Sequence, residues 1–288
     1  MTPTDTPTIE RSLSTQRHVH EPHRIGLPPL VPYLRALWQR REFAFQLART
    51  RLRSQNYDTV FGQLWLILNP LLLVGVYFVL VDIIRHGHHP AHFFARLMAA
   101  VFAFHFVSDA IRQGAKSVVQ GGKLILNTAF PRLLLPIASV ITGFIRLLPT
   151  LGIYAVVHLL NGLTVSLTTL WVIPLVALFT LLATGLSIFV AAAQVYFRDL
   201  SSFLPYLLRV WMYVSPVLFA AKDVPANYHW LLVVNPIAPL LNAWNRVLLH
   251  NVPPTANQLG LGVAYSVAFM VVGAVFFMSR EREFAVRL

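Results

Sequence analysis

Long apolar stretches follow one another along the chain from residue 59 onward. A helix that crosses the hydrocarbon core of a bilayer needs about 20 mostly apolar residues. The run from residue 147 to 197 contains no Asp, Glu, Lys or Arg and is too long for one crossing, so Asn161-Gly162 is its natural turn. Six stretches result, covering residues 59–81, 94–111, 133–160, 170–194, 203–221 and, at its centre, 263–278. The pattern predicts an all-α membrane protein with six transmembrane helices in a domain spanning residues 59–288.

Two segments precede the first of these stretches. Residues 1–32 are rich in Thr, Pro, His and Arg and have no apolar period, which predicts a disordered cytoplasmic tail. In residues 33–58, apolar side chains share one stripe of a helical wheel with Arg side chains on both flanks. This pattern predicts a basic amphipathic helix at the membrane interface, followed by a link. Arg41 falls inside the apolar stripe, where it either snorkels or contacts another protein.

A third unusual segment, residues 222–257, is too apolar for a solvated loop. Asn235-Pro236 and Pro239 break it into pieces that are too short to span. We therefore expect re-entrant or interfacial helices at the outer face.

Composition supports the membrane assignment. Of 288 residues, 56% are hydrophobic and 12% are charged, whereas a soluble domain is about 25% charged. This balance excludes a soluble enzyme of ordinary type. The absence of cysteine excludes disulfides, zinc–thiolate sites and iron–sulfur clusters.

The formal charge of +12 indicates basic loops facing anionic lipid rather than nucleic acid. With the amino terminus inside, the cytoplasmic segments hold most of the 23 Lys and Arg residues. The positive-inside rule then places both termini of a six-span protein in the cytoplasm.

Few residues suggest chemistry of their own, and we expect no catalytic residue. The chain contains no G-x-x-x-x-G-K-[ST] phosphate-binding loop, so ATP hydrolysis, if used, belongs to another polypeptide. Asp82 and Asp109 fall at the edges of predicted spans, where interfacial placement is favoured over a proton relay. The histidine tract at residues 86–92 has no acidic partner and reads as a polar turn rather than a metal site.

Charges and rings within the spans leave two interpretations open. Arg146 and Arg209 are costly in lipid, so each either contacts an anionic substrate or has a snorkelling or interhelical role. Aromatic rings either form belts at the membrane edges or stack on sugar faces along a channel. The channel candidates are Tyr77, Phe102, Phe106, Tyr206, Trp211 and Tyr213.

Five motifs occur in a fixed order along the chain. They are Arg40-Arg41-Glu42 leading to Phe61-Gly62-Gln63-Leu64-Trp65, Gly121-Gly122-Lys123 through Phe130-Pro131-Arg132, Tyr196-Phe197-Arg198-Asp199-Leu200, Ser215-Pro216-Val217, and Asn235-Pro236 with Pro239. In this order they resemble the six-span permease subunits of ABC-2 type ABC exporters, particularly those for O-antigen, galactan and teichoic acid. One departure is the pair Gly121-Gly122, which stands where the family has a carboxylate beside Lys123.

The resemblance implies a homodimer in the bacterial inner membrane, bound to two copies of a separate ATPase that carries ATP and Mg²⁺. This chain would need no cofactor of its own. The substrate would be a lipid-linked glycan, and the alternatives are a drug or small-lipid exporter of the same family and a non-ABC carrier.

Two sets of site residues follow from the resemblance. The residues implied for ATPase coupling are Arg40, Arg41, Glu42, Lys123, Leu124, Ile125, Asn127, Arg198 and Asp199. For Arg198 and Asp199, a purely structural turn with Asp199 as helix cap is the competing interpretation. Arg146 and Arg209 join the six aromatic residues as candidates for the substrate channel.

Overall fold

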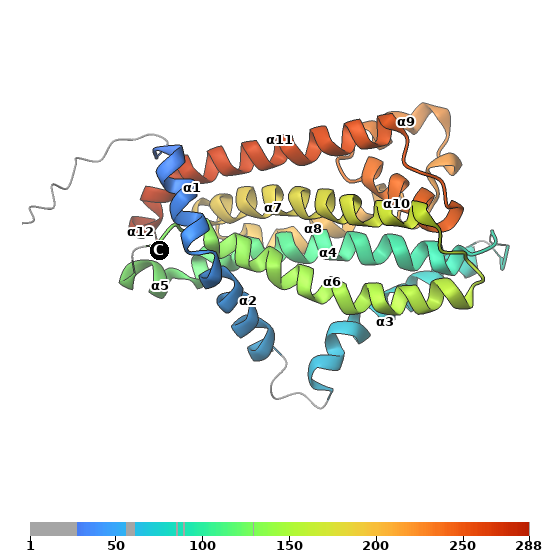
Figure 1. Ribbon diagram of the computed structural model, residues 1–288, viewed down its shortest axis with the longest axis horizontal. Coiled ribbons are helices and arrows are strands. Elements are labelled where there is room, and N and C mark those ends of the chain that lie inside the picture. The colour runs from blue at the N-terminus through green and yellow to red at the C-terminus, as the bar shows by residue number, and fades with distance from the viewer. Residues whose placement is uncertain (1–27, 56–60, 85, 89, 129, 288) are drawn as a thin grey trace, which may run out of the picture.

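The computed structural model describes residues 28–287 except 56–60, 85, 89 and 129. The described residues form helices without any strand. The long helices α4 (Phe93–Gln120), α6 (Leu134–Leu160), α7 (Val172–Tyr196) and α11 (Ala256–Arg280) run along the long axis of the molecule, whereas α3 (Trp65–Ile84) is inclined to them (Figure 1). The shorter helices are α1 (Leu30–Gln39), α2 (Arg41–Gln55), α5 (Gly122–Asn127), α8 (Leu200–Val214), α9 (His229–Val234), α10 (Ala238–His250) and α12 (Phe284–Arg287).

Among the described residues, five segments are long and apolar enough to cross a membrane: Gly62–Ile84, Phe93–Gln120, Leu134–Leu160, Leu167–Tyr196 and Ala256–Glu283. The all-helical membrane fold is therefore confirmed. The predicted count of six transmembrane helices is not confirmed. The helix at the predicted span 203–221 is α8, which has 15 residues, and its length of about 22 Å is shorter than the hydrocarbon core. Pro216 explains its end, since a proline disfavours helical backbone in the residue before it, and Ser215 is extended. The re-entrant character of α9 and α10 stays a prediction.

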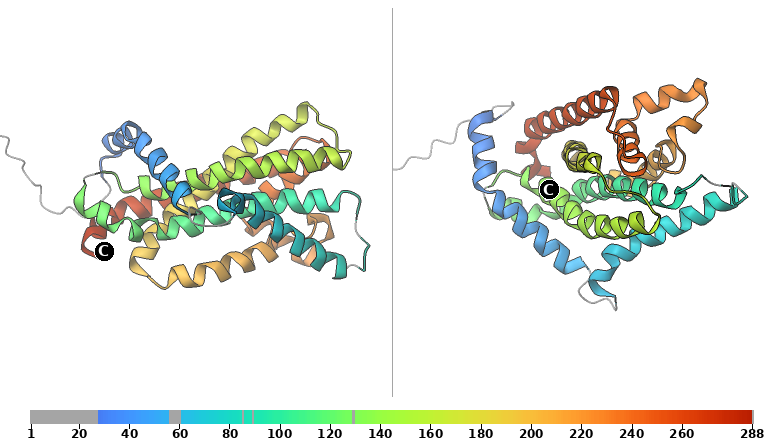
Figure 2. Two further views of the ribbon diagram at one scale, coloured as in Figure 1. Left: turned by 90° about the horizontal axis from the view of Figure 1, so that it is seen from below. Right: turned by 45° about the vertical axis from the view of Figure 1, so that its right-hand side comes forward.

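The central helix of the bundle is α4. In the most apolar 18-residue stretch of α4, 78% is buried inside the structure, whereas the figure for the corresponding stretch of the segment that contains α3 is 22%. It packs chiefly against α6 and α7, and α7 in turn packs along α11 (Figures 1 and 2). A side-chain carbon added at Gly185 of α7 would meet backbone atoms of α11, and one added at Gly273 of α11 would meet the carbonyl oxygen of Gly185. Glycine at both positions thus brings the two backbones into direct contact.

The amphipathic segment forms two helices rather than one. The backbone leaves α1 at Arg40 (φ −104°, ψ 18°) and resumes as α2 at Arg41. Leu34, Trp38 and Phe45 are exposed, as expected for a helix that lies against lipid headgroups. Of the predicted tail at residues 1–32, residues 1–27 lie outside the described residues, and α1 already begins at Leu30, so the last part of the prediction is wrong. The link at residues 56–58 also lies outside the described residues.

Most segments with a predicted cytoplasmic location gather at one end of the bundle. Figure 1 shows α1, α5 and α12 together at this end, which also holds the turn from α7 to α8. We call it the basic end, because it carries exposed or half-buried cations that include Arg35, Arg40, Arg41, Lys123, Arg132, Arg198, Arg280, Arg282 and Arg287.

Candidate functional site

A cleft of about 930 Å³ lies between α3, α4, α6 and α8, and the end of α2 also contributes to it. Its lining is cationic: the charged residues are Arg51, Arg112, Lys116, Arg146, Arg209 and Asp109. Asp109 is the one carboxylate among the described residues that line the cleft. The remaining wall is mostly apolar and aromatic, so the cleft can take an anionic group beside an apolar or ring-shaped one.

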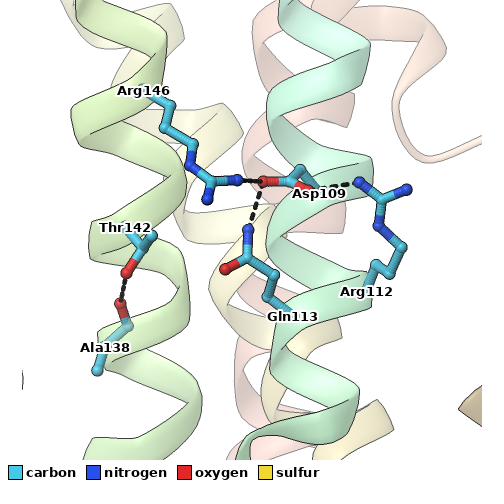
Figure 3. Close-up of polar contacts among 6 residues, drawn as sticks. All are labelled: Asp109, Arg112, Gln113, Ala138, Thr142 and Arg146. Atoms are coloured by element: carbon cyan, nitrogen blue, oxygen red, sulfur yellow. Dashed lines mark hydrogen bonds and ion pairs between the residues drawn. The ribbon is translucent and has the colours of Figure 1, made fainter. Parts of the chain in front are cut away.

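Asp109 is the centre of a polar network in the wall of this cleft (Figure 3). The Asp109 side chain is 7% exposed and pairs with two arginines. Arg112 donates to Oδ1 at 2.6 Å, and Arg146 donates to Oδ2 at 2.8 Å. Gln113 also donates to Oδ2, at 2.5 Å. The carboxylate therefore holds guanidinium groups from two different helices, α4 and α6.

Local helix geometry explains part of this arrangement. Residues three and four positions apart share a face of a helix, so Arg112 and Gln113 both reach back to Asp109. The partner on α6, Arg146, lies one turn beyond Thr142, whose hydroxyl instead donates to the carbonyl of Ala138 at 2.8 Å (Figure 3).

Asp109 does not lie at the end of its helix, as the predicted span 94–111 implied, and its placement at the membrane interface stays a prediction. The apolar run ends at Ile111, but α4 continues to Gln120 and carries Asp109 well inside the helix. The reason is that Arg112, Gln113 and Lys116 face the cleft rather than a cytoplasmic loop, so the helix does not end with its apolar stretch. For Arg146 the structure shows an interhelical partner, and direct contact with substrate stays a prediction.

Arg51 extends the cationic lining from the amphipathic segment. Its guanidinium donates to the Ser139 hydroxyl on α6 at 2.8 Å. Burial lowers the pKa of Arg51 from its ordinary value, although arginine stays protonated in proteins. The end of α2 is thereby attached to α6 beside the cleft.

The aromatic candidates divide into two groups. Tyr77, Phe102 and Phe106 line the cleft and are buried, and Arg209 lines it as well. Trp211 packs against Phe104, with ring centroids 5.4 Å apart, and donates to Asn235 at 2.8 Å. It is thus engaged in holding α8 to the segment before α10.

Tyr213 and Tyr206 do not line the cleft of the single chain. The Tyr213 ring lies edge-on to Tyr77 with centroids 6.3 Å apart. Tyr206 is 66% exposed on α8. The channel roles of all these rings stay predictions.

The coupling candidates lie at the basic end. Arg40, Arg41 and Glu42 are exposed at the junction of α1 and α2, where the Arg41 guanidinium lies 4.8 Å from the Trp38 ring centroid.

The 122–127 segment forms α5, as its apolar anchors suggest. Ile125 is buried and Leu124 half-buried, whereas Lys123 and Asn127 are exposed. Asn127 donates to the backbone carbonyl of Lys123 at 2.8 Å. This short helix therefore presents polar groups outward from an apolar attachment.

Arg198 and Asp199 form the exposed turn between α7 and α8. The Asp199 side chain makes no capping hydrogen bond to α8, so the structure does not support the capping interpretation. Arg198 donates to the carbonyl of Arg287 at 3.0 Å.

The histidine tract adopts a tight turn at the opposite end of the bundle. His86 and His92 have left-handed backbone, with φ of 53° and 58°, and His88 Nδ1 lies 2.9 Å from the carbonyl of His86. His89 lies outside the described residues.

The long apolar helices indicate a multi-pass membrane protein, and the cationic cleft between them is a candidate path for a substrate. The family model of the ABC-2 type transporter matches residues 44–249, and the chain belongs to this family. As a member it is a transmembrane subunit, and ATP is hydrolysed on a separate ABC ATPase subunit.

Two O-antigen export permeases are similar to this chain over most of their own length. The O-antigen export system permease protein RfbA of Klebsiella pneumoniae is 26% identical over 237 residues, which cover 81% of this chain and 90% of the relative. The protein of the same name from Myxococcus xanthus is 26% identical over 259 residues, covering 89% of this chain and 99% of the relative.

Proposed function

We propose that this protein is the permease subunit of an ATP-driven exporter that moves a lipid-linked polysaccharide outward across the bacterial inner membrane. The observation that carries the proposal is the cationic and aromatic cleft in a chain whose relatives are named O-antigen export permeases. Cations suit an anionic lipid anchor, and aromatic rings offer broad apolar faces to passing sugars.

Charge supports the orientation. Cations concentrate at the basic end, and cytoplasmic segments of membrane proteins carry an excess of Lys and Arg. We therefore place this end, with both described ends of the chain, in the cytoplasm. The coupling candidates on α1, α2, α5 and the α7–α8 turn then face the ATPase.

Exposed apolar surface supports assembly with a second copy. On α3, Leu72, Val76, Val79 and Ile83 are exposed, and α8 also has an exposed apolar face that includes Tyr206. The cleft is bordered by both helices. A homodimer that joins these walls would enclose a path between the two chains, with one ATPase per permease.

Deletion of the gene and complementation test the proposal in the host. We expect the deletion strain to lose polysaccharide from its surface and to accumulate lipid-linked glycan on the cytoplasmic side. Complementation with the wild-type chain should restore export, and the purified chain should carry an ATPase in a ratio of about 1:1. Normal surface polysaccharide together with increased drug sensitivity would favour a drug exporter instead.

A further inference from the structure

Residues 281–287, which we call the 281–287 segment, contact three separate parts of the basic end. The first contact is made by Glu281, just beyond α11. Tyr33 of α1 donates its phenolic hydroxyl to Glu281 Oε2 at 2.6 Å. The backbone N–H of Arg132, just before α6, donates to Oε1 at 2.6 Å. The Arg132 guanidinium also donates to the Glu281 carbonyl oxygen. One residue thus joins α1, α6 and α11.

The Tyr33 hydroxyl is well suited to this contact. Burial, together with the neighbouring Glu281 carboxylate, raises the pKa of Tyr33 above its ordinary value. The phenol therefore keeps its proton at physiological pH and acts as a donor. A hydrogen bond to an ionised acceptor is stronger than one between neutral groups.

The second contact joins the segment to α7 and the turn that follows it. Tyr196, the last residue of α7, donates to Glu283 Oε2 at 2.7 Å. The Arg287 guanidinium lies 4.4 Å from the centroid of the Tyr196 ring, and Arg287 also pairs with Glu283 at 3.5 Å. Arg198 donates to the Arg287 carbonyl. The α7–α8 turn is thereby held from two sides.

The third contact is apolar and involves α5. Phe284 is fully buried and belongs to the same hydrophobic cluster as Ile125 of α5 and Leu133. Its ring lies edge-on to Phe277 of α11, with centroids 5.1 Å apart. Large aromatic side chains contribute strongly to such packing. The 281–287 segment is therefore fixed to α5 as well as to α1, α6 and α7.

We propose that the 281–287 segment is a positioning element that makes the coupling elements of the permease move together, with Glu281 and Glu283 as its positioning residues. The inference rests on the proposed function, because coupling here means the transmission of movement from the ATPase subunit to this permease. Each of the three regions predicted to contact the ATPase, namely α1–α2, α5 and the α7–α8 turn, is attached to it. A displacement of one region is thereby imposed on the others and on α11.

The test uses the complex of this chain with its ATPase subunit, reconstituted in lipid. Tyr33→Phe removes one hydroxyl from the Glu281 contact, and Tyr196→Phe removes one from the Glu283 contact. Glu281→Gln removes a charge at nearly constant shape. Tyr228→Phe is the matched control, since Tyr228 is exposed and lies beside α9. The chain contains no cysteine, so Ser202→Cys, at the start of α8, carries a single fluorophore.

ATP binding should change the emission of this label in the wild type and in Tyr228→Phe. In Tyr33→Phe, Glu281→Gln and Tyr196→Phe we expect the ATP-induced change in emission and the export rate to fall by about fivefold or more. The two Tyr→Phe variants remove a hydrogen bond to a carboxylate, and Glu281→Gln weakens one by removing the charge of its acceptor. The KM and kcat for ATP should stay within about twofold of the wild type, because the ATPase itself is unaltered.

Three results would overturn the inference. The first is an ATP-induced change in emission that is as large in all three variants as in the wild type, and the second is a label in the wild type that does not respond to ATP. The third is a lower yield of the complex together with a raised KM and a lowered kcat for ATP. The last result would indicate a purely structural role. A wild-type complex that responds to ATP but exports no polysaccharide would instead refute the proposed function. The label would still decide the role of the 281–287 segment, because its response needs no substrate.

Discussion

Replacing Asp109 by alanine removes the acceptor at the centre of the buried polar network. Arg146 and Arg112 would each lose their carboxylate partner, and Gln113 would lose its acceptor. Two cations would then face each other across the wall of the cleft without compensation. We therefore expect Asp109→Ala to be more destabilising than Arg146→Ala, which leaves Asp109 with two of its three donors.

The size of the effect follows from burial. Breaking a buried ion pair by removing one partner costs about 3–5 kcal/mol. The Arg146 side chain is 20% exposed and the Arg112 side chain 44% exposed, so solvent in the cleft screens both, and Arg112 adds little. We expect a loss of about 2–3 kcal/mol for Asp109→Ala, which lowers the thermal midpoint by about 3–5 °C for a protein of this size.

Tryptophan fluorescence of the protein in lipid nanodiscs measures this midpoint. Asp223→Asn is the matched control, because Asp223 is exposed at the other end of the bundle, and it should change stability by less than about 0.5 kcal/mol. The double variant Asp109→Ala/Arg146→Ala should lose less than the sum of the single losses. An Asp109→Ala midpoint within about 1 °C of wild type, or strict additivity in the double variant, would refute the reasoning.

Three further predictions concern coupling, channel and packing. Leu124→Asp should abolish export, because it places a charge at the half-buried position by which α5 packs against the bundle, at a cost of a few kcal/mol. Leu124→Met should keep export, and transport assays on the two variants at equal membrane insertion compare them. Tyr77→Leu combined with Phe102→Leu should slow export of long glycan by about fivefold, because two rings are lost from the cleft; unchanged export with normal ATP hydrolysis would contradict a stacking role. Gly273→Ala should lower the yield of folded protein, whereas Gly260→Ala on the same helix, with open space around it, should keep or slightly raise stability; size-exclusion profiles of both variants compare them.

The sequence pattern predicts the long helices well because a membrane span is a local property. An apolar stretch of sufficient length must be helical in lipid, whatever surrounds it. The same reasoning overestimated the 203–221 stretch, since apolar composition continues through Ser215-Pro216 although the helix does not. The break between α1 and α2 at Arg40 also has no Gly or Pro to mark it.

The candidate site depends on tertiary contacts that periodicity does not contain. Asp109 and Arg146 are separated by 37 positions, and nothing local indicates that they meet. A usable signal was present: a carboxylate and an arginine in neighbouring apolar helices are each costly alone and stable as a pair. The contacts of Glu281 with Tyr33 and Arg132 were missed for the same reason, because they join residues 248 and 149 positions apart.

The backbone contact between Gly185 and Gly273 has a consequence for measuring motion in this protein. Because no side chain separates α7 from α11 at this point, sliding or rolling of one helix past the other would carry neighbouring side chains into the facing backbone, and we expect close packing to oppose it. Probes attached to exposed positions of these two helices near the contact would keep a constant separation through the transport cycle. The distance between such a pair of probes serves as an internal reference, and the displacement of any other helix can be measured relative to it.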